Sequence, residues 1–199
     1  MKTAEVILRP EFAKEVAVLY HDMEKAYDRT AKALDFSCSG CPDNCCDSYF
    51  LHHTYTEWAY LWQGLKTLDA GQLQIINEKA TQYVVKSAAA LGQGKRPVIM
   101  CPLNMDGLCS LYSHRLMICR LHGIPASFTR PDGKKLEFPG CFRCQELVSP
   151  DKSLTPLDRT QFFRRLVELE LELLGHKRMA APKVKLTIAQ MIVKGPPTL

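Results

Sequence analysis

Nine cysteines in a chain of 199 residues are the feature most able to do chemistry. Their spacing includes two C-x2-C pairs, Cys38 with Cys41 and Cys141 with Cys144, and an adjacent pair, Cys45-Cys46. A C-x2-C turn lets two sulfurs converge on one ion, and thiolates favour zinc, copper(I) and iron–sulfur clusters. All nine are therefore candidate metal ligands: Cys38, Cys41, Cys45, Cys46, Cys101, Cys109, Cys119, Cys141 and Cys144.

The adjacent pair Cys45-Cys46 bears on how many sites there are. Neighbouring side chains point in different directions on most backbones, so we predict that the two do not serve one mononuclear ion together. They would feed two metal centres or bind different irons of one cluster. Two four-thiolate sites use eight sulfurs and leave one spare. Taken alone, Cys119 also fits a free core cysteine, because reduced cysteine is commonly buried. The odd count argues against a framework of disulfides.

Three residues close to the cysteines in sequence are candidates for contact with a cofactor. Arg115 and Arg120 can donate hydrogen bonds to thiolates or hold an anionic substrate, since a thiolate-rich site concentrates negative charge. Surface or ordinary ion-pairing arginines fit equally well. Tyr112 can supply a hydroxyl near the ligands, or it can be a packed core ring.

Histidines supply alternative ligands. His52 and His53 follow Cys46 closely, and His114 and His122 flank Cys119. Imidazole binds both zinc and iron, but nine sulfurs make such ligands unnecessary. Glu57 fits a first-turn helix acid better than a general base. We find no Gly-rich phosphate loop, nucleophile elbow or carboxylate pair typical of a catalytic site.

Apolar periodicity predicts the elements that position these residues. The fold class is mainly α: a helical domain with a loop-rich, cysteine-rich centre and a short β-hairpin. Residues 1–199 form one domain, with a metal-binding core at about 36–146 and flanking helices at 10–35 and 155–177. In more detail, we expect long helices at Glu11–Leu34, Thr56–Leu68, Gln72–Leu91 and from Thr155 to Gly175, with Thr56 as the N-cap of the second. We expect a short helix at Ser113–Leu121 and a docking helix within Pro182–Leu199. The strands that we expect are a short one at Pro97–Met100 and a hairpin at Phe128–Phe138.

Composition and charge narrow the class of protein. No apolar run approaches the roughly 18–20 residues of a membrane helix, and the N-terminus lacks the apolar region of a secretory signal, so we expect a cytoplasmic protein. The formal charge is +5 without any run of five like charges, which argues against nucleic acid as a partner. Two four-thiolate metal sites, each carrying about −2, would lower that charge to about +1.

The cysteine pattern resembles the bacterial and archaeal cysteine-cluster proteins, whose zinc- or iron-chelating domain is named for a CxxCxxCC motif. The resemblance covers about residues 38–144. Two departures are a three-residue spacer between Cys41 and Cys45, and Leu116 where the family has proline. The matching residues are Cys38, Cys41, Cys45 and Cys46, then Cys101-Pro102, then the segment from Cys109 to Arg120, which is similar to C-x-x-Y-x-x-R-P-x-x-C-R, and finally Cys141 or Cys144.

The resemblance implies a metal-binding protein without defining a reaction. Our leading hypothesis is an iron–sulfur cluster, or clusters, held by the cysteines, with a redox or electron-transfer role and an unknown protein or small-molecule partner. One alternative is a structural Zn²⁺ protein whose surface binds a partner. The other is a cluster-containing protein-modification enzyme, since some flagellin lysine methylases carry a similar cysteine cluster. Thiolate ligands suit both metals, and the adjacent pair favours iron–sulfur.

Overall fold

The computed structural model describes residues 4–39, 45–147 and 155–199. The predicted mainly α class is confirmed, with a small sheet beside the helices. The helices are α1 Pro10–Ala33, α2 Tyr55–Leu65, α3 Ala70–Gly92, α4 Met117–Arg120, α5 Phe142–Leu147, α6 Thr160–Leu174 and α7 Ile188–Val193. The strands are β1 Asn104–Met105, β2 Leu108–Cys109, β3 Ala126–Thr129, β4 Lys135–Phe138 and β5 Leu157–Asp158.

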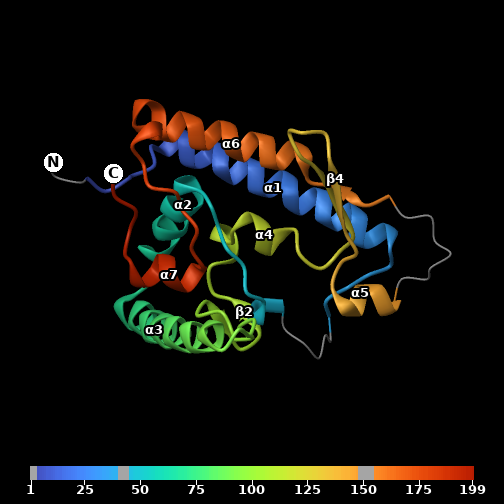
Figure 1. The fold of residues 1–199 in the computed structure, drawn as a ribbon, viewed down its shortest axis with the longest axis horizontal. Coiled ribbons are helices and arrows are strands. Elements are labelled where there is room, and N and C mark those ends of the chain that lie inside the picture. Colours follow the sequence, from blue (N-terminus) through green and yellow to red (C-terminus); the bar gives the residue numbers. More distant parts are fainter. Residues whose placement is uncertain (1–3, 40–44, 148–154) are drawn as a thin grey trace.

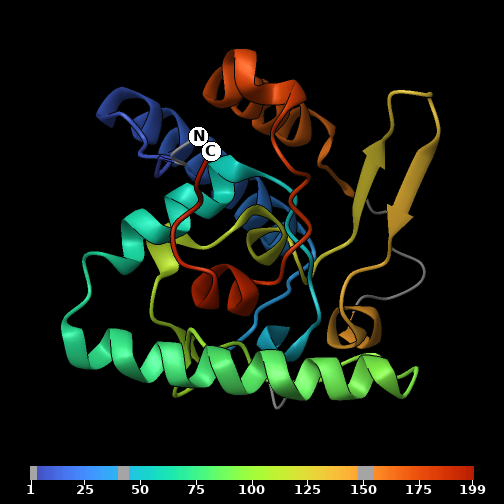
Figure 2. The same cartoon turned by 60° about the vertical axis from the view of Figure 1, so that its left-hand side comes forward.

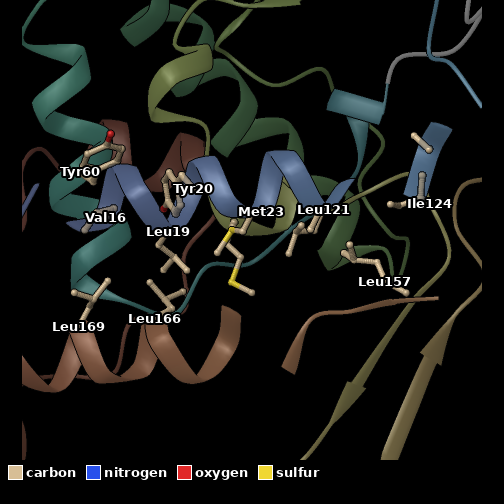
Figure 3. Close-up of a cluster of buried hydrophobic side chains, with 14 of the residues drawn as sticks. Val16, Leu19, Tyr20, Met23, Tyr60, Leu121, Ile124, Leu157, Leu166 and Leu169 are labelled. Carbon is tan, nitrogen blue, oxygen red and sulfur yellow. The ribbon is translucent and has the colours of Figure 1, made fainter. Parts of the chain in front are cut away.

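Helices α1 and α6 lie side by side along one edge of the molecule (Figure 1). The predicted helix at Glu11–Leu34 is confirmed to within a residue at each end, and Pro10 occupies its first turn. Apolar side chains spaced for one helix face, such as Val16, Leu19 and Met23, are buried against α6 and the centre of the chain (Figure 3). We call this cluster, which also contains Leu166 and Leu169 of α6, the first core.

A second core joins α2, α3 and α7. Leu61, Ile76 and Met191 are completely buried in it. Helix α3 forms the opposite edge of the molecule, with α7 packed on it (Figure 2). The carbonyl of Met191 accepts hydrogen bonds from the indole nitrogens of Trp58 and Trp62, at 3.1 and 3.0 Å. The predicted C-terminal docking helix is therefore confirmed as α7.

The N-cap of α2 is Thr54, so the prediction of Thr56 was wrong. Thr54 Oγ1 accepts the amide of Glu57 at 3.2 Å. Thr56 lies inside the helix, where its amide and hydroxyl both donate to Glu170 of α6, at 2.8 and 2.7 Å. The same carboxylate accepts the amide of Tyr55 at 2.8 Å. A carboxylate from a distant helix thus satisfies amides that α2 itself leaves without partners.

The predicted hairpin is confirmed as β3 and β4, which pair antiparallel from Ala126–Phe138 to Thr129–Lys135. Strand β5 adds to the other edge of β3 in parallel. For this reason α6 begins at Thr160 rather than Thr155: the chain first pairs with β3, and the amide of Arg159 donates to the Ser127 carbonyl at 2.8 Å.

Two predictions in the centre of the chain were wrong in detail. Pro97–Met100 is not a strand, although Ile99 and Cys101 donate backbone hydrogen bonds to Asp47 and Cys46, at 3.3 and 2.9 Å. The helix expected from Ser113 to Leu121 is divided. A 3-10 turn covers Tyr112–His114, and α4 begins only after Leu116.

The described ends of the chain meet. Ala4 and Leu199 exchange two backbone hydrogen bonds, of 3.0 and 2.9 Å. None of the helices in the three described ranges combines the length and apolar character needed to span a bilayer.

Candidate metal centre

One partly open cavity beside the second core is lined by five thiols, those of Cys45, Cys46, Cys101, Cys109 and Cys119. We call Cys46, Cys101, Cys109 and Cys119 the inner thiol group. The cavity has a volume of about 50 Å³, several times the roughly 10–15 Å³ that one water molecule requires. Burial raises the pKa of Cys101, and the nearby Cys119, Cys46 and Cys109 raise it further. The thiols are thus close enough to affect one another's ionisation.

Local backbone structure places each member of the inner thiol group. The Cys101 amide donates to the carbonyl of Cys46, which joins the two segments. Strands β1 and β2 form a tight hairpin whose corner, Asp106-Gly107, has φ angles of 51° and 88°. Two successive left-handed residues are characteristic of a type I′ turn, for which Asp-Gly is a favoured pair. The turn brings Cys109 opposite Asn104, while α4 carries Cys119.

Cys45 and Cys46 contact one another. Hydrogen bonds from the Cys45 thiol and from Asn104 lower the pKa of Cys46 to about 6, and the Arg115 charge contributes to this shift. The adjacent sulfurs are therefore closer together than their opposed directions predicted. Their other neighbours differ, because Cys45 also interacts with Cys38, whereas Cys46 belongs with Cys101 and Cys109.

A second set of thiols, the outer thiol group, consists of Cys38, Cys141 and Cys144. Cys38 Sγ lies 3.8 Å from the Tyr27 hydroxyl, and the Cys144 amide donates to Cys141 Sγ at 3.4 Å. Cys144 is fully buried in the first core, and this burial, together with the nearby Cys141 and Cys38, raises its pKa to about 11. The predicted ligand Cys41 lies outside the described residues.

A hollow of about 610 Å³ lies next to both groups. Cys38 and Cys141 line this hollow, and so do Cys45, Cys46 and Cys109, which line the cavity as well. The hollow is therefore bordered by members of both thiol groups.

Arg115 and Arg120 have different surroundings. Arg115 lines both the cavity and the hollow, where the charges of Cys119, Cys45 and Cys46 oppose the effect of burial and raise its pKa. Arg120 is buried and donates to the carbonyls of Arg115, Tyr112 and Ser113 at 2.6, 2.8 and 2.9 Å. Only Arg115 of the pair is placed to face the thiols; Arg120 shapes the backbone between Cys109 and Cys119.

Tyr112 lies on the rim of the hollow and is 53% exposed. Its hydroxyl donates to Glu24 Oε1 of α1 at 3.1 Å. The hydroxyl that was expected near the ligands therefore donates to a carboxylate of α1 instead.

The four histidines near the cysteines in sequence also lie in different surroundings. His53 is exposed, whereas His52, His114 and His122 line the cavity. His114 packs on the Tyr60 ring, with 4.6 Å between centroids, and His122 packs on Phe50 at 5.0 Å. Burial lowers the pKa of both. These two imidazoles, packed against aromatic rings in tilted and edge-to-face arrangements, form part of the cavity wall.

His52 and Glu57 form a buried charged pair that the sequence interpretation missed. Burial alone would lower the pKa of His52, but hydrogen bonds to Cys119 and Glu57 and their charges raise it to about 9. Burial would raise the pKa of Glu57, and contact with His52 instead lowers it.

Across residues 4–39, 45–147 and 155–199, no group of three or more Cys, His, Asp or Glu side chains has the arrangement needed to hold a metal ion. The thiols share a cavity without forming a ready ligand set. Comparison of the chain with protein-family models, with curated proteins and with solved structures finds no match.

Proposed function

We propose that the chain binds an iron–sulfur cluster through the inner thiol group and takes part in electron transfer with a protein or small-molecule partner. The observation that supports the proposal is that Cys46, Cys101, Cys109 and Cys119, from four separate positions in the chain, line one cavity. In the described part of the chain, no carboxylate lines this cavity. Sulfur ligands without oxygen ligands favour zinc, copper(I) or iron–sulfur clusters over hard cations.

The size and charge of the cavity support a cluster over a single zinc ion. A volume several times that of one water molecule accommodates a group of several atoms. Four thiolates around a cluster with a 2+ core carry about −2, and the Arg115 guanidinium at the cavity wall offsets part of that charge. The resemblance of the cysteine pattern to zinc- or iron-chelating proteins is consistent with either metal.

The proposal is tested by purification without oxygen, followed by absorption spectroscopy and analysis of iron, zinc and acid-labile sulfide. We expect a brown protein with broad absorbance near about 400 nm and equal amounts of iron and sulfide. Cys109→Ser should lose the cluster and melt at a lower temperature, because metal binding and folding are linked. Ser110→Ala, a change at the exposed neighbour, is the matched control and should keep both.

Two outcomes would contradict the proposal. A colourless protein with stoichiometric zinc would replace the cluster with a structural zinc site. A Cys109→Ser variant with full iron content and an unchanged melting temperature would exclude this cysteine as a ligand.

A further inference from the structure

Most of the excess positive charge of the chain lies in one short segment near its C-terminus. Residues 175–185, which we call the basic segment, contain Lys177, Arg178, Lys183 and Lys185 and no Asp or Glu, so they hold four of the five net positive charges. All four basic side chains are exposed. In the part of the chain that the structure describes, none of them forms an ion pair. Their charge is therefore not neutralised there.

Contacts with the rest of the protein hold the basic segment in place. Residues 175–179 form a 3-10 turn that continues from the C-terminal end of α6 (Figure 1). The carbonyl of Pro182 accepts the hydroxyl of Tyr55 at 3.0 Å. Val184 is buried in the second core, between two exposed lysines. The lysines thus project into solvent from a backbone that is anchored on both sides of them.

Exposed apolar side chains lie at the same end of the molecule as these charges. Met179, in the basic segment, is 92% exposed, more than any other large apolar side chain of the described residues. Four positions separate it from Lys183, so the two Cα atoms are at most about 14 Å apart. Ile7 is 73% exposed and lines a groove with Leu173, which lies two residues before the 3-10 turn. Apolar and unpaired basic side chains are therefore neighbours here.

This combination fits the surface of an anionic bilayer better than it fits a nucleic acid. Binding at a bilayer interface combines the burial of apolar side chains with attraction between basic side chains and anionic headgroups. The phosphates of a nucleic acid would pair with the charges alone and leave Met179 in water, and the basic segment has no Trp, Tyr or Phe to stack on bases. No residue of the basic segment lines the cavity or the hollow, so the surface is separate from the candidate metal centre.

We propose that the basic segment docks the protein on the surface of an anionic lipid bilayer, with its four basic side chains against the headgroups and Met179 inserted at the interface. This inference goes beyond the proposed function and does not depend on a bound metal. Each basic side chain near such a surface strengthens binding by about fivefold, and the attraction falls as salt is added.

Co-sedimentation of the full chain with lipid vesicles tests the proposal. One set of vesicles is phosphatidylcholine alone, and the other is phosphatidylcholine mixed with phosphatidylserine. We expect binding only to vesicles that contain phosphatidylserine, and weaker binding at higher salt. Lys183→Gln/Lys185→Gln should bind them about 30-fold more weakly, because two charges are lost. Lys86→Gln/Lys95→Gln, the matched control, removes two exposed lysines from α3 or just after it, at the opposite edge of the molecule (Figure 2), and should change binding by less than about twofold.

Variants of Met179 test the apolar part of the contact while all charges are kept. Met179→Ser should weaken binding to the phosphatidylserine vesicles about tenfold, and Met179→Leu should bind like the parent. Because this side chain is almost fully exposed, neither change should alter the melting temperature. If Lys183→Gln/Lys185→Gln does not fold, Lys177→Gln/Arg178→Gln makes the same test on the 3-10 turn.

Four results would overturn the proposal or part of it. Equal binding of the parent to both kinds of vesicle, or binding to neither, overturns it. A loss in Lys86→Gln/Lys95→Gln as large as that in Lys183→Gln/Lys185→Gln would mean that net charge alone attracts the protein, without a docking surface. A Met179→Ser variant that binds as tightly as the parent overturns the insertion of the methionine. Binding of the parent to duplex DNA at the same salt, without binding to vesicles, would make nucleic acid the partner instead.

Discussion

Arg115 and Arg120 lie five residues apart and make contacts of different kinds. Arg120 has its planar group buried among three backbone carbonyls, and its Cζ lies 4.8 Å from the centroid of the Tyr20 ring. Arg115 faces the thiols instead. Matched substitutions at the two positions should therefore affect different properties of the protein.

Arg120→Met should lower the free energy of unfolding by about 2–3 kcal/mol, because it leaves buried carbonyls without a donor. Arg115→Met should change that free energy by less than about 0.5 kcal/mol in the metal-free protein, and it should shorten the lifetime of the bound cluster. Urea unfolding and the decay of visible absorbance measure the two effects. Equal losses of stability in both variants would contradict this division of roles.

At this scale the sequence predicts which residue types form the site but not how they group. The number and spacing of the cysteines indicate thiolate chemistry without any structure. The division into inner and outer groups depends on contacts such as that between Cys101 and Cys46, which are 55 positions apart along the chain. No local pattern encodes such a contact. Glu57 was likewise read as an ordinary first-turn acid, because its partner His52 lies outside the helix.

Among the elements, the contact of α6 with the start of α2 is the clearest case of one helix completing another. Glu170 accepts the amides of Tyr55 and Thr56 and the hydroxyl of Thr56. Glu170→Ala should lower the free energy of unfolding by about 2–3 kcal/mol, since three buried or half-buried donors lose a charged acceptor. The change is measured by urea unfolding.

Glu168→Ala on the same helix is the control. Its carboxylate is 62% exposed and pairs with Arg165 at 3.0 Å, and a surface pair of this kind contributes less than about 1 kcal/mol. If Glu170→Ala is no more destabilising than Glu168→Ala, then Thr54 alone is sufficient to cap α2.

Long helices and the hairpin were predictable because their apolar period and turn residues are local. The start of α6 and the N-cap of α2 were not, because β3 and Glu170 decide them from elsewhere in the chain. Helix α5 was missed for another reason. It is six residues long and contains Cys144, so the C-x2-C pair around it was interpreted only as a ligand turn.

Across the whole molecule, the two thiol groups belong to different cores. Cys144 is buried in the first core with α1 and α6, while Cys101, Cys109 and Cys119 pack against the second core with α2, α3 and α7. The C-terminal segment also reaches the inner group, since Leu186 pairs with His52 and residues 187–189 line the cavity. Loss of metal from the inner group should therefore loosen the second core more than the first.

Hydrogen exchange tests this expectation, because it reports the opening of each segment separately. On removal of the metal by anaerobic chelation, we expect faster exchange at residues 99–121, at 45–52 and in α7, where the backbone depends on the inner group. Helices α1 and α6 should keep their protection, since Val16, Leu19 and Leu169 bury their contacts without any inner thiol. A uniform rise over all helices would mean that the two cores open as one unit, and an unchanged pattern would mean that metal does not organise the inner group. Because metal binding is linked to the folding of the segments that hold the ligands, the response should be confined to those segments.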